Sequence, residues 1–244
     1  MVQPQITLYA TDFSPYSHSV DIALLEAGVN YTRFEVDLQN KPEWFIKQVN
    51  PAGQVPALTY GGSDAPPSEP SLDSIKLRES HVLLELVADL FPEARLLPED
   101  PTHRAKVRLF MDVLKTKLLP VWYAHFRGGQ PAEPFLVVLE ELQAMLPPTG
   151  FVAGEWSIAD AAIITILVRE EVILELEHEV SGWSAGEGKR VLDILHGPRF
   201  ARLAQYQREL EGRPAFKATF DKAQIADKFA SWFNRVVRLR KQQV

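Results

Sequence analysis

Ser14 stands where the sequence predicts the start of a helix, in the stretch ATDFSPYSHSV at residues 10–20. Pro15 follows it, and proline is favoured at the first position of a helix. The simplest interpretation is an N-cap, in which the Ser14 hydroxyl accepts a hydrogen bond from an amide of the first turn. A helix start also stabilises an anion such as a thiolate, to which a hydroxyl can donate one hydrogen bond. Nothing in this stretch supplies a base that would make Ser14 a nucleophile.

Two further segments carry residue types that suit a bound ligand. Val55 and Pro56 open a predicted strand, and the simplest interpretation is an ordinary strand that begins at a proline. Glu79 and Ser80 precede a predicted helix, which Ser80 would cap. The amides of that helix start, together with the Ser80 hydroxyl, also suit a carboxylate. Lys41, taken by itself, is an ordinary solvated charge.

Short alternating segments in the first 92 residues must position these side chains. Alternation of apolar and polar residues predicts strands at residues 5–10, 31–37, 54–60 and 74–78. Apolar residues at helical spacing predict helices from Ser14 to Gly28, at 41–49 and at 80–91. The order β-α-β-α-β-β-α predicts a small mixed α/β domain over residues 1–92.

The rest of the chain is predicted to be helical. Three prolines in residues 91–103 mark a linker, which we assign to residues 93–102. Beyond it, residues 103–244 are predicted to form an all-α domain, with helices at 103–126, 134–146, 157–176, 189–197, 198–210 and 223–241. The first of these is expected to bend near Pro120. Ser157 and Asp160 have the spacing of a capping box, which we interpret as structural.

Composition excludes several classes of function. The net charge of -6 is the opposite of what a nucleic-acid-binding protein usually carries. The chain has no cysteine, which rules out disulfides and cysteine-ligated metals, and its six histidines lack metal-like spacing. No apolar run reaches the roughly 20 residues that span a bilayer, and no secretion signal is present. We therefore expect a cytoplasmic protein without a metal site, a membrane span or a nucleic-acid partner.

Four motifs in order resemble those of glutathione transferases, most closely the omega class in its fungal form. They are IxLYxxxFxPY at residues 6–16, NKPEWF at 40–45, NPxGxVPAL at 50–58 and ES at 79–80. Each is weak alone, but together they span most of residues 6–90. The resemblance implies a thioredoxin-like N-terminal domain followed by a helical domain, and usually a homodimer. GEWSIAD at residues 154–160 resembles the capping segment of that family's central helix.

Ser14 is the departure from the omega pattern, which has a cysteine at this position. The resemblance therefore implies that the reactive sulfur belongs to the co-substrate glutathione, and that Ser14 orients and stabilises its thiolate as the catalytic residue. Tyr9 is the alternative, because some classes use a tyrosine of the first strand for this task. A tyrosine here also belongs to the omega pattern as scaffold, which is the interpretation we favour.

The resemblance also implies how glutathione would be bound. A cis bond between Val55 and Pro56 would free the backbone of Val55 to pair with the cysteinyl unit, with a further contact from Gln54. Glu79 suits the ammonium of the γ-glutamyl group, and Ser80 with the helix amides suits its α-carboxylate. Lys41 would pair with the glycyl carboxylate.

A second pocket for an apolar, aromatic substrate is expected at the interdomain cleft of this family. The sequence does not specify which aromatic and apolar residues face it, because most of them suit a core. The candidates are Phe13, Tyr16, Leu114, Trp122, Tyr123 and Phe229.

Three functions fit these observations. The first is a glutathione transferase with a serine site, which conjugates glutathione to electrophiles or reduces peroxides in detoxification, with weak or no cysteine-type thiol-transferase activity. The second is a non-catalytic carrier of small aromatic molecules such as polyphenols. The third is an interaction module, against which the set Lys41, Val55, Glu79 and Ser80 argues, because a module needs no glutathione site.

Overall fold

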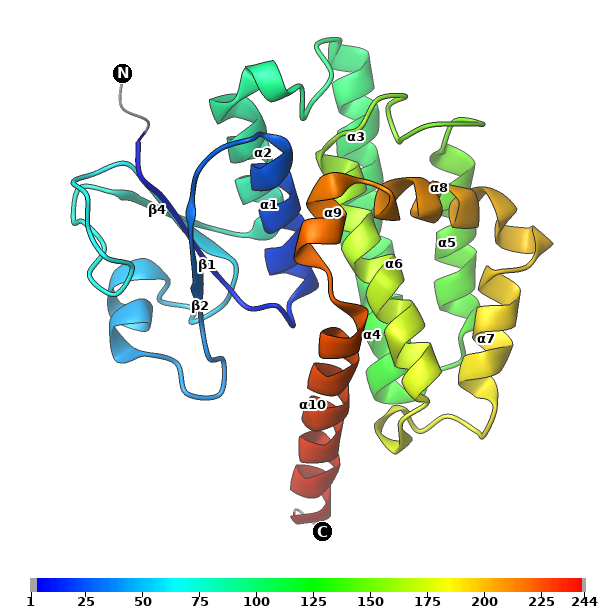
Figure 1. Ribbon diagram of the computed structural model, residues 1–244. Helices are drawn as coiled ribbons and strands as arrows, with labels where there is room; N and C mark the ends of the chain where they lie inside the picture. Colours follow the sequence, from blue (N-terminus) through cyan, green and yellow to red (C-terminus); the bar gives the residue numbers. More distant parts are fainter. Residues whose placement is uncertain (1–3, 243–244) are drawn as a thin grey trace. The chain divides into compact units, whose positions relative to one another are not determined.

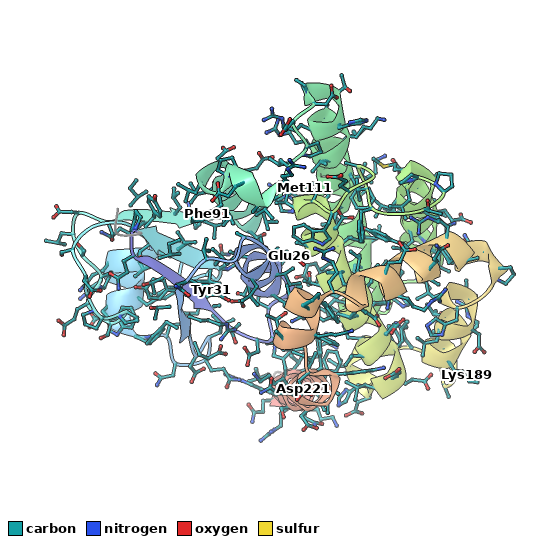
Figure 2. The ribbon with its side chains drawn as sticks, turned by 45° about the horizontal axis from the view of Figure 1, so that its top comes forward. Glu26, Tyr31, Phe91, Met111, Lys189 and Asp221 are labelled. Carbon is teal, nitrogen blue, oxygen red and sulfur yellow. The ribbon has the colours of Figure 1, made fainter. Side chains whose placement is uncertain are left out.

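The computed structural model describes residues 4–242. The chain divides into two compact units, Met1–Leu97 and Pro98–Val244 (Figure 1). The first contains a sheet with helices, and the second contains helices with two isolated bridges near residue 153. Figure 2 shows the side chains, with Tyr31 and Phe91 labelled in the first unit and Met111, Lys189 and Asp221 in the second. This confirms the predicted fold class, a thioredoxin-like domain followed by a helical one.

The first unit is built on a four-stranded mixed sheet. The strands are β1 (Ile6–Ala10), β2 (Thr32–Glu35), β3 (Ala57–Tyr60) and β4 (Ile75–Arg78), in the spatial order β2-β1-β3-β4. β1 pairs in parallel with β2 and antiparallel with β3, which pairs antiparallel with β4. All four predicted strands are confirmed, although the third begins at Ala57 and not at residue 54.

Helices α1 (Pro15–Glu26) and α2 (Ser80–Leu90) lie together on one side of this sheet (Figure 1). The apolar stripe of α1, including Val20, Ala23 and Leu24, is fully buried. The segment predicted as a helix at 41–49 contains a short π-helical turn, Phe45–Val49, and a 3-10 turn, Pro92–Ala94, follows α2. The predicted element order is therefore confirmed.

The second unit packs its helices around α6. Its elements are α3 (Pro101–Val113), a π turn (Leu114–Leu118), α4 (Leu119–Gly128), α5 (Glu133–Met145), α6 (Ile158–Leu176), a 3-10 turn (Glu179–Ser181), α7 (Glu187–Leu195), a 3-10 turn (Pro198–Phe200), α8 (Ala201–Glu211), α9 (Pro214–Thr219) and α10 (Lys222–Gln242). Most of α6 is buried on all sides, as expected of a helix without a polar face. The sequence did not predict α9.

The helix predicted at residues 103–126 contains a π turn just before Pro120. Proline has no amide hydrogen and its ring crowds the carbonyl four residues earlier. A π turn at this point widens the backbone and so accommodates the proline without ending the helix. The irregularity in this helix thus lies near Pro120, where a bend was expected, and it takes the form of the π turn Leu114–Leu118.

Asp160 completes the predicted capping box at the start of α6. Its Oδ2 accepts hydrogen bonds from the Ser157 amide at 2.7 Å and the Ser157 hydroxyl at 2.8 Å. Its Oδ1 accepts from the Val152 amide at 3.1 Å and from the Tyr206 hydroxyl on α8. Burial raises the pKa of Asp160, and these four donors oppose that effect. The structural interpretation of this motif is confirmed.

Candidate functional site

The sheet register brings three of the predicted binding segments to one end of the first unit. Tyr9 near the end of β1 pairs with Ala57 at the beginning of β3, and Ala57 pairs with Arg78 at the end of β4. The loop that leads from β1 to Ser14, the segment before β3 and the residues after β4 must therefore leave the sheet at the same end. Glu79 follows directly from Arg78.

Ser14 caps α1, as the simplest interpretation predicts. Its Oγ accepts a hydrogen bond from the Ser17 amide at 3.2 Å, and its own amide donates to the Thr11 carbonyl at 3.0 Å. The side chain is buried, with 7% of the residue exposed. Within residues 4–242 we find no acceptor for the Ser14 hydroxyl hydrogen. The oxygen is thus fixed at the positive end of α1 while its hydrogen stays available to a ligand.

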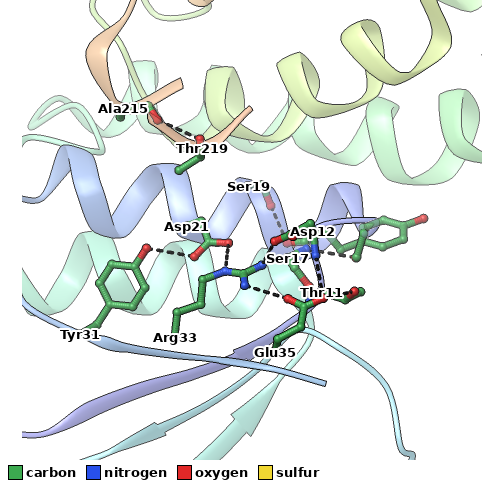
Figure 3. Close-up of polar contacts among 12 residues, drawn as sticks. Thr11, Asp12, Ser17, Ser19, Asp21, Tyr31, Arg33, Glu35, Ala215 and Thr219 are labelled. Atoms are coloured by element: carbon green, nitrogen blue, oxygen red, sulfur yellow. Dashed lines mark hydrogen bonds and ion pairs between the residues drawn. The ribbon is translucent and has the colours of Figure 1, made fainter. Parts of the chain in front are cut away.

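Arg33 anchors the loop that carries Ser14 (Figure 3). Its guanidinium donates to Asp12 in that loop at 2.6 Å, to Asp21 on α1 at 3.0 Å and to Glu35 at 2.8 Å. Glu35 in turn accepts from the Thr11 hydroxyl at 2.7 Å. One arginine therefore joins strand β2, helix α1 and the β1–α1 loop.

Burial controls the electrostatics of this Arg33 cluster. It raises the pKa of Asp21, against the opposing charge and hydrogen bond of Arg33. Burial, followed by the charge of Asp21, also raises the pKa of Tyr31, whose hydroxyl donates to Asp21 at 2.9 Å. Burial alone would lower the pKa of Arg33, but the charges of Asp21 and Asp12 and the hydrogen bonds to Glu35 and Asp21 together outweigh it, and the pKa is raised. Arg33 is therefore a permanent cation.

The sequence reasoning missed this cluster, although one signal was present. Asp21 lies in α1 between the buried residues Val20 and Ile22, where an isolated carboxylate would be costly. A buried acid in such a helix calls for a cation nearby. Arg33 and Glu35 occupy alternate positions of β2 and so point to the same side of that strand.

Val55 and Pro56 lie immediately before β3 and are joined by a cis peptide bond, as the resemblance implied. Asn50 shapes the turn that precedes them. Its side-chain amide donates to the Gln54 carbonyl at 2.8 Å, and its Oδ1 accepts from the Ala52 amide at 3.1 Å. Asn50 is 1% exposed, so this turn is held from inside the unit. Val55 stands outside the ladder, whose register begins at Ala57.

Lys41 lies against the same turn. Its side chain folds over Gly53, so closely that a Cβ on Gly53 would lie 3.4 Å from the Lys41 Cδ and 3.5 Å from its Nζ. Gly53 also has a φ of 60°, which favours glycine. Lys41 is exposed, and within the described part of the chain its ammonium has no carboxylate partner. The structure thus brings Lys41 against Gly53, the residue that precedes Gln54 and Val55.

Glu79, and not Ser80, occupies the N-cap position of α2, so the prediction that Ser80 caps this helix is wrong. Ser80 is the first residue inside α2, where its side chain cannot reach the first-turn amides. Glu79 makes no side-chain capping bond, and its φ of 71° is strained for a residue with a side chain. Glu79 is exposed and Ser80 is half-buried. The start of α2 thus has no side-chain cap from Glu79.

Tyr9 belongs to the core of the first unit. It is fully buried among Val36, Phe45, Val49 and Ala57, and its hydroxyl donates to the Pro67 carbonyl at 2.8 Å. Burial raises its pKa. These contacts confirm the scaffold interpretation of Tyr9.

The residues predicted to hold a second substrate lie in both units. Phe13 and Tyr16 are half-buried in the first. In the second, Leu114, Trp122 and Phe229 are each no more than 2% exposed.

Two of these residues have polar or cationic contacts of their own. Trp122 donates its indole N–H to Glu170 at 2.5 Å. Tyr123 is half-buried, and the Arg127 guanidinium lies 4.6 Å from its ring centroid.

Between residues 4 and 242, no three histidine or acidic side chains are grouped closely enough to hold a metal ion. In the same range, no helix combines the length and the apolarity that a membrane crossing requires.

Comparison with known proteins points to one family. Residues 8–95 match the family model described as glutathione S-transferase, N-terminal domain. The chain is similar to glutathione S-transferase omega-2 of Rattus norvegicus, with 31% identity over 82% of this chain and 66% of that protein. A probable glutathione S-transferase of Solanum tuberosum is 32% identical over 53% of this chain, and the match spans about half (54%) of that protein.

Solved structures from Trametes versicolor are similar over almost the whole chain. Glutathione transferase Omega 1C is 42% identical with a TM-score of 0.91, and the match covers 95% of this chain and 97% of that one. Glutathione transferase Omega 2S, in complex with 2,4-dihydroxybenzophenone, is 44% identical with a TM-score of 0.85, covering 94% of this chain and 97% of that one. Both fold and sequence are thus shared over both units.

Proposed function

The chain belongs to the glutathione transferase family, in its omega-like group, and on that basis we propose that it activates glutathione at Ser14. The products would be glutathione conjugates of electrophiles, or the alcohol left when a peroxide is reduced. This is the chemistry open to a chain in which residue 14 is serine and no cysteine exists elsewhere. Glutathione then supplies the sulfur as a co-substrate.

The glutathione molecule would lie across the end of the sheet where the three segments meet. Its cysteinyl backbone pairs with the free main chain of Val55, with Gln54 beside it. The γ-glutamyl carboxylate binds Ser80 and the open amides of α2, and the ammonium binds Glu79. Lys41, lying beside Gly53, pairs with the glycyl carboxylate. The ammonium and the glycyl carboxylate of the ligand thereby each meet an opposite charge, and the γ-glutamyl carboxylate meets hydrogen-bond donors at a helix start.

Ser14 acts on the sulfur as a hydrogen-bond donor. Glutathione's thiol gives its proton to solvent, and the thiolate is stabilised by the Ser14 hydroxyl and the helix start. In conjugation the sulfur bonds to an electrophilic carbon, which releases its leaving group with the bonding electrons. In peroxide reduction the sulfur takes one oxygen and the alcohol leaves, and a second glutathione then yields the disulfide and water.

The availability of the Ser14 hydroxyl hydrogen, at an oxygen fixed by Ser17, is the observation that carries this proposal. Conjugation rates measured from pH 6 to 9 in the parent and in Ser14→Ala test it. If Ser14 stabilises the thiolate, the variant needs a higher pH for the same rate. Identical profiles in the two proteins would leave Ser14 as a cap only.

A second function, binding of small aromatic molecules without reaction, is favoured by the similarity to the Trametes Omega 2S protein. That protein was solved with 2,4-dihydroxybenzophenone and is 44% identical to this chain. We infer that this chain also takes up polyphenol-like molecules, whether or not they react. A titration with a hydroxybenzophenone in the presence and absence of glutathione separates carriage from conjugation, because only conjugation consumes the thiol.

The expected location, oligomeric state and biological role of the protein follow from the same proposal. We expect a cytoplasmic homodimer that acts in detoxification, using the glutathione pool as its source of thiol. Light scattering of the purified protein gives the oligomeric state directly. A monomer at micromolar concentration would contradict the dimer without affecting the proposed chemistry.

A further inference from the structure

Two buried titratable side chains of the second unit, Glu170 of α6 and His125 of α4, face one another. Glu170 Oε1 lies 3.9 Å from His125 Nε2, and the two residues are 1% and 0% exposed. Neither atom has a hydrogen-bond partner among the described residues. The proposed glutathione site uses neither residue. Two unsatisfied polar atoms that face one another in a core call for an explanation of their own.

The other contacts of this Glu170–His125 pair fix where its hydrogens lie. His125 Nδ1 lies 2.9 Å from the Gln130 carbonyl, which can only accept, so Nδ1 carries a hydrogen. Glu170 Oε2 accepts a hydrogen bond from the Trp122 indole N–H at 2.5 Å. A neutral His125 therefore presents Nε2 to Glu170 Oε1 as an acceptor. Two facing acceptors repel one another unless a proton lies between them.

Burial decides which member of the pair carries this proton. It raises the pKa of Glu170 to about 8, while the hydrogen bond from Trp122 opposes the rise. It lowers the pKa of His125, while the bond to the Gln130 carbonyl opposes the fall. At neutral pH the pair is therefore an uncharged carboxylic acid beside an uncharged imidazole, with the proton on Glu170.

The charged groups of α7 that act on the pair oppose one another. Glu187 raises the pKa of His125 and Arg190 lowers it. The Arg190 guanidinium and the Glu187 carboxylate are also joined by an ion pair at 2.7 Å. These two side chains therefore leave the charge of the pair to be set by its burial.

The charged neighbours of Glu170 along α6 have contacts of their own. Arg169 donates to the Thr165 carbonyl at 3.1 Å, and Glu171 Oε1 lies 3.1 Å from His196 Nε2. Ionised Glu170 would be a buried carboxylate that faces an acceptor on one side and receives the Trp122 hydrogen bond on the other. Such a charge is costly until further donors reach it.

Trp183 covers His125. Its ring stacks on the His125 ring, with the centroids 4.5 Å apart and the planes at 24°. Its indole N–H donates to the His125 carbonyl at 3.1 Å. Trp183 belongs to a loop of residues 182–186, the Trp183 loop, which joins the 3-10 turn Glu179–Ser181 to α7. One tryptophan of this loop therefore holds both the ring and the main chain of His125.

The rest of the Trp183 loop can move at little cost. Its other four residues are exposed, and Gly182 and Gly186 at its two ends have φ of 68° and 85°. Ser181, directly before the loop, is 1% exposed, and its Oγ has no hydrogen-bond partner among the described residues. A segment with few buried contacts opens locally more easily than the helices around it.

We propose that the Glu170–His125 pair is a pH switch: it holds one proton, and loss of that proton to solvent opens the Trp183 loop. With the proton in place, Glu170 Oε1 is a donor that faces the acceptor Nε2, and Trp183 stays on His125. Without it, the carboxylate needs donors. Water supplies them once Trp183 leaves the His125 ring. The switch lies within the helical unit and does not depend on the proposed glutathione chemistry.

Fluorine NMR of the whole protein containing 5-fluorotryptophan tests the proposal, because the chain has five tryptophans. Replacement of each by phenylalanine assigns its resonance. Between pH 6.5 and 9.5 we expect the resonances of Trp122 and Trp183 to shift with one midpoint near pH 8, whereas Trp44 in the first unit stays constant. The H2O–D2O shift of Trp183, which reports contact with solvent, should rise over the same range. A Trp183 resonance that does not change with pH would overturn the proposal.

Glu170→Gln isolates the ionisation. Its amide oxygen can accept from Trp122 and its NH2 can donate to His125 Nε2 at every pH, so the loop should stay closed up to pH 9.5. Glu171→Gln, at the next position of α6, is the matched control and should keep the transition near pH 8. A Trp183 transition that persists in Glu170→Gln, or that disappears from both variants, would refute the assignment to Glu170.

A reciprocal measurement keeps the proposal testable should Glu170→Gln fold poorly. If closure of the loop holds the proton on Glu170, weakening the closed loop must make Glu170 ionise at lower pH. Trp183→Phe keeps an aromatic ring but loses the hydrogen bond to the His125 carbonyl. We expect it to lower the midpoint of the Trp122 resonance by about 0.5 to 1 pH unit. Trp156→Phe, whose ring lies beside Arg213, is the control and should leave the midpoint unchanged. An unchanged midpoint in Trp183→Phe would show that loop and proton are not coupled.

Discussion

Arg33 Nε donates to Asp21 Oδ2 at 3.0 Å and thereby joins strand β2 to the middle of α1 (Figure 3). The Asp21 side chain is only 5% exposed, whereas that of Arg33 is 29% exposed. The same guanidinium holds Asp12 in the loop before Ser14. The position of the Ser14 hydroxyl therefore depends on a cation that lies nineteen positions further along the chain.

Arg33→Gln should lower the free energy of unfolding by about 3 kcal/mol, because it leaves the Asp21 carboxylate buried without its cation. Urea denaturation gives this value. Adding Asp21→Asn should recover part of the loss, since the buried group then carries no charge. Arg190→Gln, which breaks an exposed pair with Glu187 in the other unit, is the control and should cost less than about 1 kcal/mol. A comparable loss in both variants would mean that burial of Asp21 is not the cause.

Ser14→Ala should slow glutathione conjugation at neutral pH by about tenfold and move the onset of activity upward by about one pH unit. The helix start still stabilises the thiolate, so activity remains. Removal of the cap should also cost about 1 kcal/mol of stability. Tyr9→Phe is the control for the rate, because the Tyr9 hydroxyl is bonded to Pro67 in the core. If Tyr9→Phe conjugated glutathione slowly and Ser14→Ala conjugated it at the parent rate, Tyr9 and not Ser14 would be the residue that stabilises the thiolate.

Ser14→Cys should gain thiol-transferase activity and lose part of the conjugation activity. A thiol at this helix start has a lowered pKa and can accept a glutathionyl group from a mixed disulfide. Rates on a glutathione mixed disulfide and on an aromatic electrophile, with intact mass after addition of oxidised glutathione, measure both changes. Efficient disulfide reduction by the parent would refute the idea that position 14 separates the two chemistries. So would a cysteine variant that never gains the mass of glutathione.

Glu79→Ala should weaken glutathione binding by about 1–3 kcal/mol, the usual cost of removing a charged hydrogen-bonding partner. Calorimetry on the parent should give a dissociation constant between about 1 μM and 1 mM. Glu69→Ala, at an exposed loop position of the same unit, provides the matched control. Unchanged affinity in Glu79→Ala would remove this residue from the site.

Glu170 should make the protein less stable as the pH rises from about 4.5 to about 8. In this range the unfolded chain has lost the Glu170 proton and the folded chain retains it, because the folded pKa is raised from 4.5 to about 8. The contribution of Glu170 is therefore full below pH 4.5 and is lost towards pH 8. His125 opposes this trend only below its ordinary pKa of 6.5, since burial lowers its folded pKa.

Between pH 6.5 and 8, Glu170→Gln should remove a slope of about 1.4 kcal/mol of unfolding free energy per pH unit. Urea titrations of the parent and the variant at pH 6.5, 7.2 and 8.0 measure the difference. If the unfolding free energies of the parent and the variant changed with pH by the same amount, Glu170 would ionise normally in the folded state.

Much of the candidate site followed from local sequence. The alternation of apolar and polar residues predicted strands with one end close in sequence to Ser14, Pro56 or Glu79. The mixed directions of these strands bring those ends together. The N-cap of α2 was assigned one residue too late, because the positive φ of Glu79 has no signature in a residue other than glycine or asparagine. The π turn before Pro120 was likewise hidden, since proline specifies an irregularity and not its form.

Contacts between distant parts of the chain could not be predicted from sequence patterns. Trp122 and Glu170 are 48 positions apart, and no sequence pattern links them. Glu170 stands between Arg169 and Glu171 in the sequence, whereas Asp21 could be recognised there as an acid between apolar neighbours. Its partner could be named only once the packing of the helices was known, because many cations or donors could have met it.

The contacts of Asp160 have a consequence for the order in which parts of the protein fold during synthesis. It caps α6 with one oxygen and binds Tyr206, 46 residues further on, with the other. At a synthesis rate of about 5–20 residues per second, roughly 2 to 9 s separate the addition of the two residues to the growing chain. During that interval Asp160 can accept hydrogen bonds from Ser157 and Val152 but not from Tyr206. The packing of the helical unit around α6 can therefore be completed only late in translation, after Tyr206 has been synthesised.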